Sequence, residues 1–344
     1  MLSTSKAVNS ILQGLSPRQK EVVIGRFGFV GSKAGETLAA IGDRMKVTRE
    51  RVRQIEKSAL ETISGQIGDN PACMQILARS KKDLKNAGGV MKKDSLLESA
   101  KNFADGLHEN HLALLIEASG AFYLYPEDDN FWPFYYLGKN ELKAATNFID
   151  KWVGLLESRK LEILSGSYKT KFVSFVKTNQ IQKSIAENFL GISKAIHESP
   201  YGDVGLRDWP EIRPATTRDR AYLILKKKAK PLHFTAIAEA INEDRLGGAQ
   251  VALAPTVHNE LIKDTRFVLV GRGIYGLREQ GYEPGIAREV IQKILKRQGP
   301  LTHKEIVTQM QKQRFFKPNT ILINLQNKNF FERLQDGKYR VRES

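Results

Sequence analysis

The chain has 344 residues, a hydrophobic fraction of 41% and a formal net charge of +16. This hydrophobic fraction is typical of a folded protein and excludes a wholly disordered one. The length predicts two or three domains. The large excess of Lys and Arg favours a polyanionic partner such as DNA or RNA. A basic protein with no nucleic-acid role remains the alternative.

The single cysteine, Cys73, excludes internal disulfides and cysteine-based zinc clusters. One cysteine is also typical of a reducing, intracellular setting. No stretch approaches the ~18 apolar residues of a membrane span, and the first residues contain no signal peptide. The sequence therefore predicts a cytoplasmic, nucleoid-associated protein with no membrane partner.

The stretch 37–60, TLAAIGDRMKVTRERVRQIEKSAL, predicts a helix, a short turn and a second helix. The first helix is expected to run from Thr37 to Met45. Thr48 is a good N-cap for the second. Such a pair is a helix-turn-helix, whose second helix enters the DNA major groove.

The second helix has two opposed faces. At about 100° per residue, Val52, Ile55 and Ala59 fall on one apolar side. The opposite side carries Arg, Glu, Gln and Lys, the residue types that read base edges. Arg51 flanks this polar face and suits a phosphate. A merely solvated helix surface is the alternative.

The runs LSPRQKEVVIGRFG (15–28) and TLAAIGDRMKVTRERVRQIEKSAL (37–60) resemble region 4 of primary bacterial RNA polymerase sigma factors. The resemblance covers about residues 10–65. It implies binding to the −35 promoter element and to the flap of the polymerase β subunit, with residues 17–27 and 58–63 offering the flap-facing surface. It places four residues of the second helix on −35 bases, and Thr37 and Arg51 on the DNA backbone. The expected DNA-binding residues are Thr37, Thr48, Arg49, Glu50, Arg51, Arg53, Gln54 and Lys57.

About a dozen residues precede the resemblance. The sigma regions that melt promoter DNA are therefore expected to be missing. The chain is expected to recognise promoter-like DNA without melting it.

The rest of the chain predicts a repeating unit of three helices followed by a β-hairpin, which is a winged helix. Its clearest copies are 212–281 and 282–344, where PLHFTAIAEAI and PLTHKEIVTQM occupy equivalent places, as do GIYGLRE and GKYRVRE. Two weaker copies are expected at 67–138 and 139–211. With the helix-turn-helix at 1–66, the predicted fold is mainly α, a helix-turn-helix followed by tandem winged-helix units.

Residues 205–281 also resemble the HARE-HTH domain, on the runs GLRDWPEIRPATTRDRAYLILKKKAKPLHFTAIAEAIN and APTVHNELIKDTRFVLVGRGIYGLRE. That winged-helix module occurs in the delta subunit of RNA polymerase, in chromatin proteins and in fusions with restriction endonucleases. The resemblance implies a second link to transcription.

A winged helix reads DNA with its third helix and touches the backbone with its wing. The possible DNA-binding residues of the last two units are Thr256, His258, Asn259, Arg272, Asn319, Thr320, Asn324, Lys338 and Arg340. Binding to protein is an equal alternative for both units. The unit 67–138 has an acidic hairpin tip, PEDDN, that phosphates would repel. Its aromatic hairpin (122–135) is expected to pack on its own core, or else to dock a protein.

Catalytic and metal-binding patterns are weak. Gly271, Gly273 and Gly276 spell GxGxxG, but a strand follows them where a nucleotide site requires a helix. His108 and His111 have no matching third ligand. Glu141 and Lys143 faintly match a PD-(D/E)xK nuclease pattern. We therefore expect no enzyme, cofactor or metal.

The sequence predicts a DNA-binding transcription factor that acts with bacterial-type RNA polymerase on double-stranded DNA, contacting the β flap or other subunits. An architectural, non-specific DNA-binding protein and the DNA-reading subunit of a restriction/modification system are the alternatives.

Overall fold

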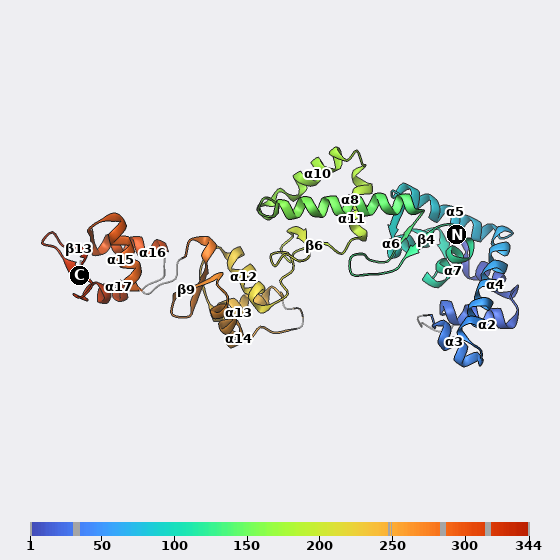
Figure 1. Cartoon of the computed structure of the whole chain (residues 1–344), viewed down its shortest axis with the longest axis horizontal. Helices are drawn as coiled ribbons and strands as arrows, with labels where there is room; N and C mark the ends of the chain where they lie inside the picture. Colours follow the sequence, from blue (N-terminus) through green and yellow to red (C-terminus); the bar gives the residue numbers. More distant parts are fainter. Residues whose placement is uncertain are drawn as a thin grey trace. The chain divides into compact units, whose positions relative to one another are not determined.

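The computed structural model describes residues 2–29, 35–246, 248, 250–282, 287–313 and 318–342. The chain divides into two compact units, 1–197 and 198–344 (Figure 1, blue to green and yellow to red). Helical residues outnumber strand residues in each unit, and the strands form small, mostly antiparallel sheets. The predicted mainly α fold is thereby confirmed.

The first unit opens with helices whose ends carry local start and stop signals. The Ser16 hydroxyl accepts a hydrogen bond from the Gln19 amide, and the Gln19 side chain accepts one from the Ser16 amide. Both residues lie at the start of helix α2 (Pro17–Phe27), and Gly28 ends the same helix in the left-handed conformation, with φ of 69°. The helices are α1 (Thr4–Gln13), α2 (Pro17–Phe27), α3 (Leu38–Met45) and α4 (Arg49–Gly68).

The turn between α3 and α4 is tight. Lys46 adopts a left-handed conformation with φ of 56°, and the Val47 amide donates to the Gly42 carbonyl at 2.9 Å. A Cβ at Gly42 would lie 2.7 Å from the Val47 carbonyl oxygen, so the turn requires glycine there. The helix-turn-helix is confirmed, and α3 begins at Leu38, one residue after the expected start at Thr37. Its small buried core consists of Val22, Ile41, Val52 and Ile55.

A winged helix follows in the same unit, and its three strands form one antiparallel sheet in the order β2-β5-β4. The first strand, between the first two helices, was not part of the predicted unit. A short parallel pair, β1 (Leu2–Ser3) with β3 (Ala104–Asp105), lies beside it. The elements of the winged helix are α5 (Pro71–Asn86), β2 (Val90–Lys92), α6 (Lys93–Lys101), α7 (Glu109–Ser119), β4 (Tyr123–Tyr125) and β5 (Phe134–Tyr136).

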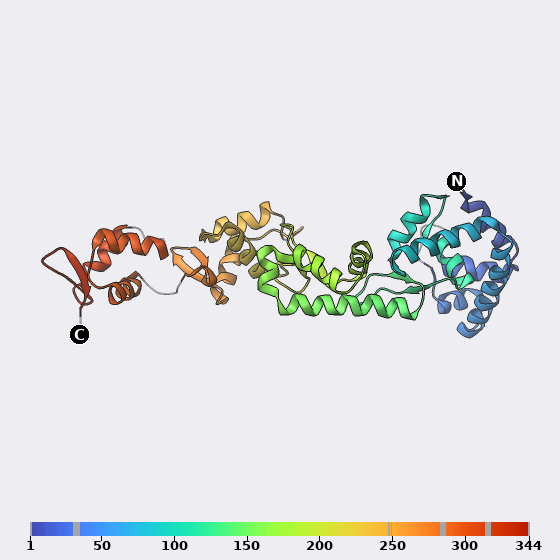
Figure 2. The same ribbon diagram turned by 90° about the horizontal axis from the view of Figure 1, so that it is seen from above.

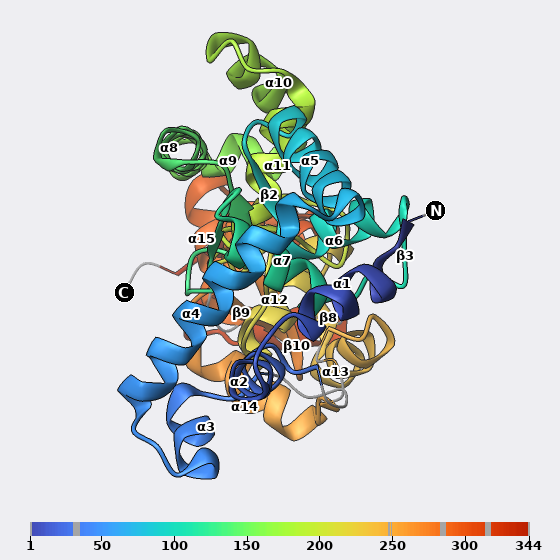
Figure 3. The same ribbon diagram turned by 90° about the vertical axis from the view of Figure 1, so that its right-hand side faces the viewer.

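The helix-turn-helix and this winged helix share one hydrophobic core. Val23 of α2 and Ile63 of α4 are fully buried in the same cluster as Leu112 and Leu115 of α7. Helix α7 is apolar on nearly every side, which is typical of a helix with neighbours all round. Figure 3 shows α3 beside the start of α4 and α7 beside its later turns. The two modules therefore form a single folded body.

Residues 139–211, all of which the structure describes, differ from the expected winged helix. Their strands are a two-stranded pair, β6 and β7, with no strand between the helices. Helices α8 and α11 instead pack on β2, and the Asn188 side chain donates to the carbonyls of Ala87 and Val90 at 2.8 and 2.6 Å. The elements are α8 (Lys139–Ser158), α9 (Lys160–Glu162), a π-helical turn (Ile163–Ser167), α10 (Tyr168–Thr178), α11 (Lys183–Ile192), β6 (Ile196–Glu198) and β7 (Val204–Leu206).

The physical reason for this difference is aromatic packing. Phe134 of the hairpin is completely buried and stacks on Tyr125 with ring centroids 4.8 Å apart. In addition, Phe131 forms an antiparallel bridge with Ser193. The fully buried Trp152 of α8 packs on Phe172 of α10, and the two helices run side by side in Figures 1 and 2. Phe122, Phe134 and Tyr135 of the aromatic hairpin are therefore buried in the first unit, whereas Tyr123 and Trp132 are 53% and 40% exposed.

The second unit contains two winged helices with the same strand pattern, β8-β10-β9 and β11-β13-β12. The equivalent runs found in the sequence fall on equivalent elements, β8–α13 and β11–α16. The first copy comprises α12 (Thr217–Lys228), β8 (Leu232–His233), α13 (Phe234–Glu243), α14 (Ala254–Lys263), β9 (Phe267–Gly271), β10 (Ile274–Leu277) and a 3₁₀ turn (Arg278–Gln280). The second comprises α15 (Ala287–Gln298), β11 (Leu301–Thr302), α16 (His303–Gln313), α17 (Pro318–Leu325), β12 (Phe331–Arg333) and β13 (Lys338–Val341).

Candidate nucleic-acid interface

The first turns of α4 present the polar face that the sequence predicts. The Thr48 hydroxyl accepts a hydrogen bond from the Arg51 amide at 3.2 Å and so caps the helix. Val52 and Ile55 are buried in the core beneath it. The side chains exposed on the solvent side are Arg49, Glu50, Arg51, Arg53, Gln54 and Lys57. Thr37 caps α3 in the same way, by accepting from the Ala40 amide at 3.2 Å.

Two pairs of side chains organise this face. The Arg53 guanidinium donates from Nε and Nη2 to the two carboxylate oxygens of Glu50, at 2.9 and 2.7 Å. This hydrogen bonding lowers the pKa of Glu50 below its ordinary value. Arg51 does not stand apart from the face, because its Nη1 donates to Gln54 Oε1 at 3.1 Å. Arg53 and Arg51 are therefore each hydrogen-bonded to a polar neighbour on this face.

An ion pair between the buried Glu56 and the exposed Arg26, which sequence reasoning missed, links α4 to α2. Glu56, only 9% exposed, accepts a hydrogen bond at 3.0 Å from Arg26 Nε of α2. A buried carboxylate of this kind is stabilised by such a partner. The two residues are 30 positions apart in the chain, so no local pattern could reveal the pair.

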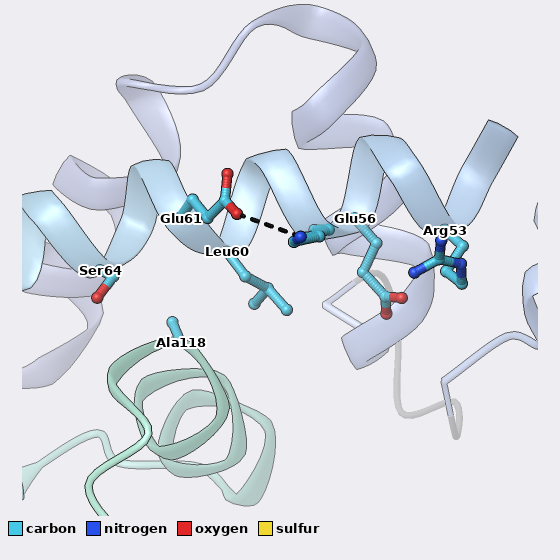
Figure 4. A pocket seen from close by; sticks show the side chains of 7 residues that line it. Arg53, Glu56, Leu60, Glu61, Ser64 and Ala118 are labelled. Carbon is cyan, nitrogen blue, oxygen red and sulfur yellow. Dashed lines mark ion pairs between the residues drawn. The ribbon is translucent and has the colours of Figure 1, made fainter. Parts of the chain in front are cut away.

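The polar face continues into a groove between α4 and α7 with a volume of about 360 Å³. Leu60 of α4 and Ala118 of α7 both point into it (Figure 4). Lys57 lies 3.9 Å from Glu61, which balances part of the charge along its wall. The groove thus has an apolar floor and mixed charges, and it begins at Arg53.

Part of the expected flap-facing surface is covered by the chain itself. Val23 of α2 and Ala59 and Ile63 of α4 are fully buried in the core that includes α7. The Asn110 side chain at the start of α7 also donates to the Gly28 carbonyl at 3.3 Å. Of residues 17–27 and 58–63, polar side chains such as Glu21 and Ser58 remain exposed.

The third helix of the unit 212–281 is much less basic. Thr256 and Asn259 of α14 are exposed, as is Arg272 at the tip of the β9–β10 hairpin. His258 is half-buried and stacks on Phe234 with ring centroids 4.5 Å apart, so it packs inside the unit. The three glycines of GxGxxG lie in this hairpin, where Gly273 has φ of +69°.

In the last unit, the expected side chains are mostly engaged with neighbours. Asn319 of α17 is exposed, whereas Asn324 is half-buried and has an interaction partner. The side chain of Thr320 lies outside the described part of the chain. On the wing, Lys338 pairs with Asp336 at 3.5 Å and Arg340 with Glu332 at 2.8 Å.

The weak catalytic and metal patterns gain no support. His111 stacks on Phe29 with ring centroids 5.5 Å apart, and its neighbour His108 lies 5.2 Å away. Among the residues that the structure describes, no cluster of three or more His, Cys, Asp or Glu could hold a metal ion. Within the same residues, no helix combines the length and apolar character of a membrane span.

These features place residues 4–68 in the class of helix-turn-helix domains with a polar, mostly basic second helix. The family model for sigma-70, region 4 matches residues 11–64. RNA polymerase sigma factor RpoD of Helicobacter pylori is 45% identical over 56 residues, 16% of this chain and 8% of that protein. RNA polymerase sigma-B factor of Nostoc sp. is 51% identical over 53 residues, 15% of this chain and 16% of the relative.

RNA polymerase sigma factor sigB of Arabidopsis thaliana is 37% identical over 73 residues, or 21% of this chain and 13% of that protein. The chain therefore spans only a small part of the length of the curated relatives that it matches. The likeness supports the resemblance stated for residues 10–65.

Proposed function

We propose that the chain is a DNA-binding transcription factor that acts with bacterial-type RNA polymerase, and that α4 recognises −35-like promoter DNA. The observation that carries this proposal is the exposed polar face of α4 above a buried apolar stripe, inside the segment matched by sigma-70 region 4. Arg49, Arg53 and Gln54 are of the residue types that form bidentate contacts with guanine and adenine. The caps at Thr37 and Thr48 leave further amide groups at two helix N-termini for phosphates.

Polymerase contact is part of the same proposal, with a restriction on where it occurs. Since Val23, Ala59 and Ile63 are buried in a core that includes α7, a polymerase subunit would meet the exposed polar remainder of α2 and α4, or another module. The winged helix at 212–281 is the second candidate, as a HARE-HTH-like module of the kind found in the RNA polymerase delta subunit. Affinity purification from the native cell should recover polymerase subunits.

The base-reading role predicts a specific loss of affinity. Arg53→Ala should weaken binding to a −35-bearing duplex by about 1–3 kcal/mol, because a bidentate base contact is lost. Fluorescence anisotropy with the −35 duplex and a scrambled duplex measures this effect. Arg159→Ala is a matched control, since Arg159 is also an exposed arginine paired three residues along a helix, with Glu162 at 2.9 Å.

An unchanged dissociation constant for Arg53→Ala on the −35 duplex would contradict the base-reading role. Equal binding of the wild-type protein to both duplexes would instead favour an architectural DNA-binding protein. Metal-dependent cleavage lost on mutation of Glu141 would favour the restriction/modification alternative. Under all three functions, binding to DNA should weaken steeply as the salt concentration rises, because the excess of basic residues contacts phosphates.

A further inference from the structure

A pocket of about 490 Å³ lies in the last winged helix, between the end of α17 and the strands β12 and β13. Both α17 and β13 are labelled in Figure 1. The buried side chains of Leu325, Phe331 and Tyr339, at most 8% exposed, contribute an apolar and aromatic floor. None of its lining residues is among the DNA-binding residues expected from the sequence.

The rim of this pocket is basic. Lys328, Arg333 and Arg342 line it, and all three side chains are exposed. Within the described part of the chain, none of them forms an ion pair. The one acidic residue of the lining, Glu332, is already held by Arg340 through Nε and Nη2, both at 2.8 Å. The pocket therefore keeps an excess of positive charge that its own carboxylate does not neutralise.

The surrounding chain concentrates this charge. Residues 282–344 contain 13 lysines and arginines against 6 acidic residues. Like charges held close together repel one another and so favour a bound anion. The wing cations Lys338 and Arg340 differ, because each has a carboxylate partner.

Part of the rim is fixed before any ligand arrives. Arg342 Nη1 donates to the Lys328 carbonyl at 2.9 Å, which ties the end of β13 to the loop after α17. The Arg333 guanidinium lies 6.0 Å from the centre of the Tyr339 ring. A guanidinium offers five N–H donors, so both arginines keep donors for an incoming group. Such pre-positioning reduces the entropy lost on binding.

We infer that this pocket binds a phosphate ester, with Lys328, Arg333 and Arg342 on the phosphate and the aromatic floor against the attached nucleoside. Arginine is well suited to phosphate because its planar fork donates two parallel hydrogen bonds. The apolar floor should favour a nucleoside phosphate over inorganic phosphate. The phosphate belongs either to a nucleic-acid strand or to a free nucleotide. This site does not depend on the surface of α4.

The test uses the full chain and two probes, a fluorescently labelled deoxyadenosine 5′-monophosphate and a labelled duplex of scrambled sequence. Arg333→Ala and Lys328→Ala should each weaken binding of at least one probe by about tenfold, because a hydrogen bond to a charged group is lost. Lys304→Ala is the matched control and should change binding less than twofold, because Lys304 of α16 is an exposed lysine of the same unit that does not line the pocket. Arg333→Gln keeps most of the side-chain stem and serves if Arg333→Ala does not fold.

The two probes distinguish the sources of the phosphate. Weakened binding of the mononucleotide indicates that the ligand is a free nucleotide. In that case unlabelled inorganic phosphate and unlabelled deoxyadenosine should each compete only weakly with the labelled mononucleotide. Weakened binding of the duplex alone, measured in an Arg53→Ala background, indicates a nucleic-acid backbone. If neither Arg333→Ala nor Lys328→Ala differs from Lys304→Ala on either probe, the inference is wrong. That result would leave the role of Arg53 untouched, and failure of the Arg53 test would leave this pocket untouched.

Discussion

Helices α4 and α14 follow a tight turn or loop in two modules of the same general kind, but they present different chemistry to solvent. The exposed side of α4 carries three arginines in its first five residues. The exposed side of α14 carries Thr256, Asn259 and Ile262, and Ile262 is 64% exposed. The cation at the end of α14, Lys263, lies 3.3 Å from Glu260, which also holds Arg218 at 2.7 Å.

This difference shows that a helix in the position of a DNA-recognition helix does not, by its position alone, have a surface suited to DNA bases. Both helices bury an apolar stripe, with Val52 and Ile55 in α4 and Val257 and Leu261 in α14. Only α4 combines that stripe with side chains that suit base edges. We therefore expect the specific DNA affinity of the chain to reside in its first unit.

Replacing one buried isoleucine should have the largest effect. Ile63→Ala should lower the free energy of unfolding of the first unit by about 2–5 kcal/mol, because it leaves a cavity where α4 meets α7. Since the helix-turn-helix and the winged helix share this core, both should unfold in one transition at lower temperature. Calorimetry measures the temperature of this transition. Ile262→Ala replaces an exposed isoleucine of α14 and is the control. An equal loss of unfolding free energy for Ile262→Ala would contradict the explanation by a buried cavity.

Removing a helix cap should have a smaller effect. Thr48→Ala should cost about 0.5–2 kcal/mol of stability, because the Arg51 amide loses its acceptor. Thr216→Ala is the matched change at the start of α12, where the hydroxyl accepts from the Asp219 amide at 3.2 Å. Denaturant unfolding should show similar losses in the two units. Only Thr48→Ala should also weaken binding to the −35 duplex, and equal binding losses would count against a reading role confined to α4.

Acid should loosen the contact between α7 and the helix-turn-helix. Burial lowers the pKa of His111 below its ordinary value of 6.5, and repulsion from His108 adds to this. Between the lowered pKa and 6.5 the unfolded state binds more protons, so stability is complete above pH 6.5 and is lost as the pH falls below it. Melting temperatures of wild type and His111→Gln at pH 8 and pH 5.5 test this. His111→Gln should lose less on acidification, whereas the exposed control His197→Gln should behave like wild type.

The smallest expected effect is on α14 itself. Asn259→Ala should change affinity for the −35 duplex by less than about 0.5 kcal/mol, because α14 offers few groups for bases or phosphates. Anisotropy under the conditions used for Arg53→Ala gives a direct comparison. A loss as large as that of Arg53→Ala would show that the second unit reads DNA as well.

The parts predictable from the sequence depend on near neighbours in the chain. The N-cap at Thr48, the turn at Lys46 and the opposed faces of α4 all follow from spacings of three or four residues. The repeated unit of the last two winged helices was visible because short runs of similar sequence recur at equivalent places in both copies. The short strands β2, β8 and β11 were missed, because two or three residues carry no readable alternation and become strands only by pairing with a hairpin far along the chain.

By itself, the sequence determined that α4 would have a buried apolar side and an exposed side of Arg, Glu and Gln. Helical periodicity fixes such faces wherever the helix forms. Tertiary structure decided what surrounds that helix. It placed Arg26 on Glu56, laid α7 over Ala59 and Ile63, and gathered Lys328, Arg333 and Arg342 around one pocket. The first two arrangements join residues that are distant in the chain, and the third gathers residues of the final hairpin and the loop before it, so only packing of the fold brings each set together.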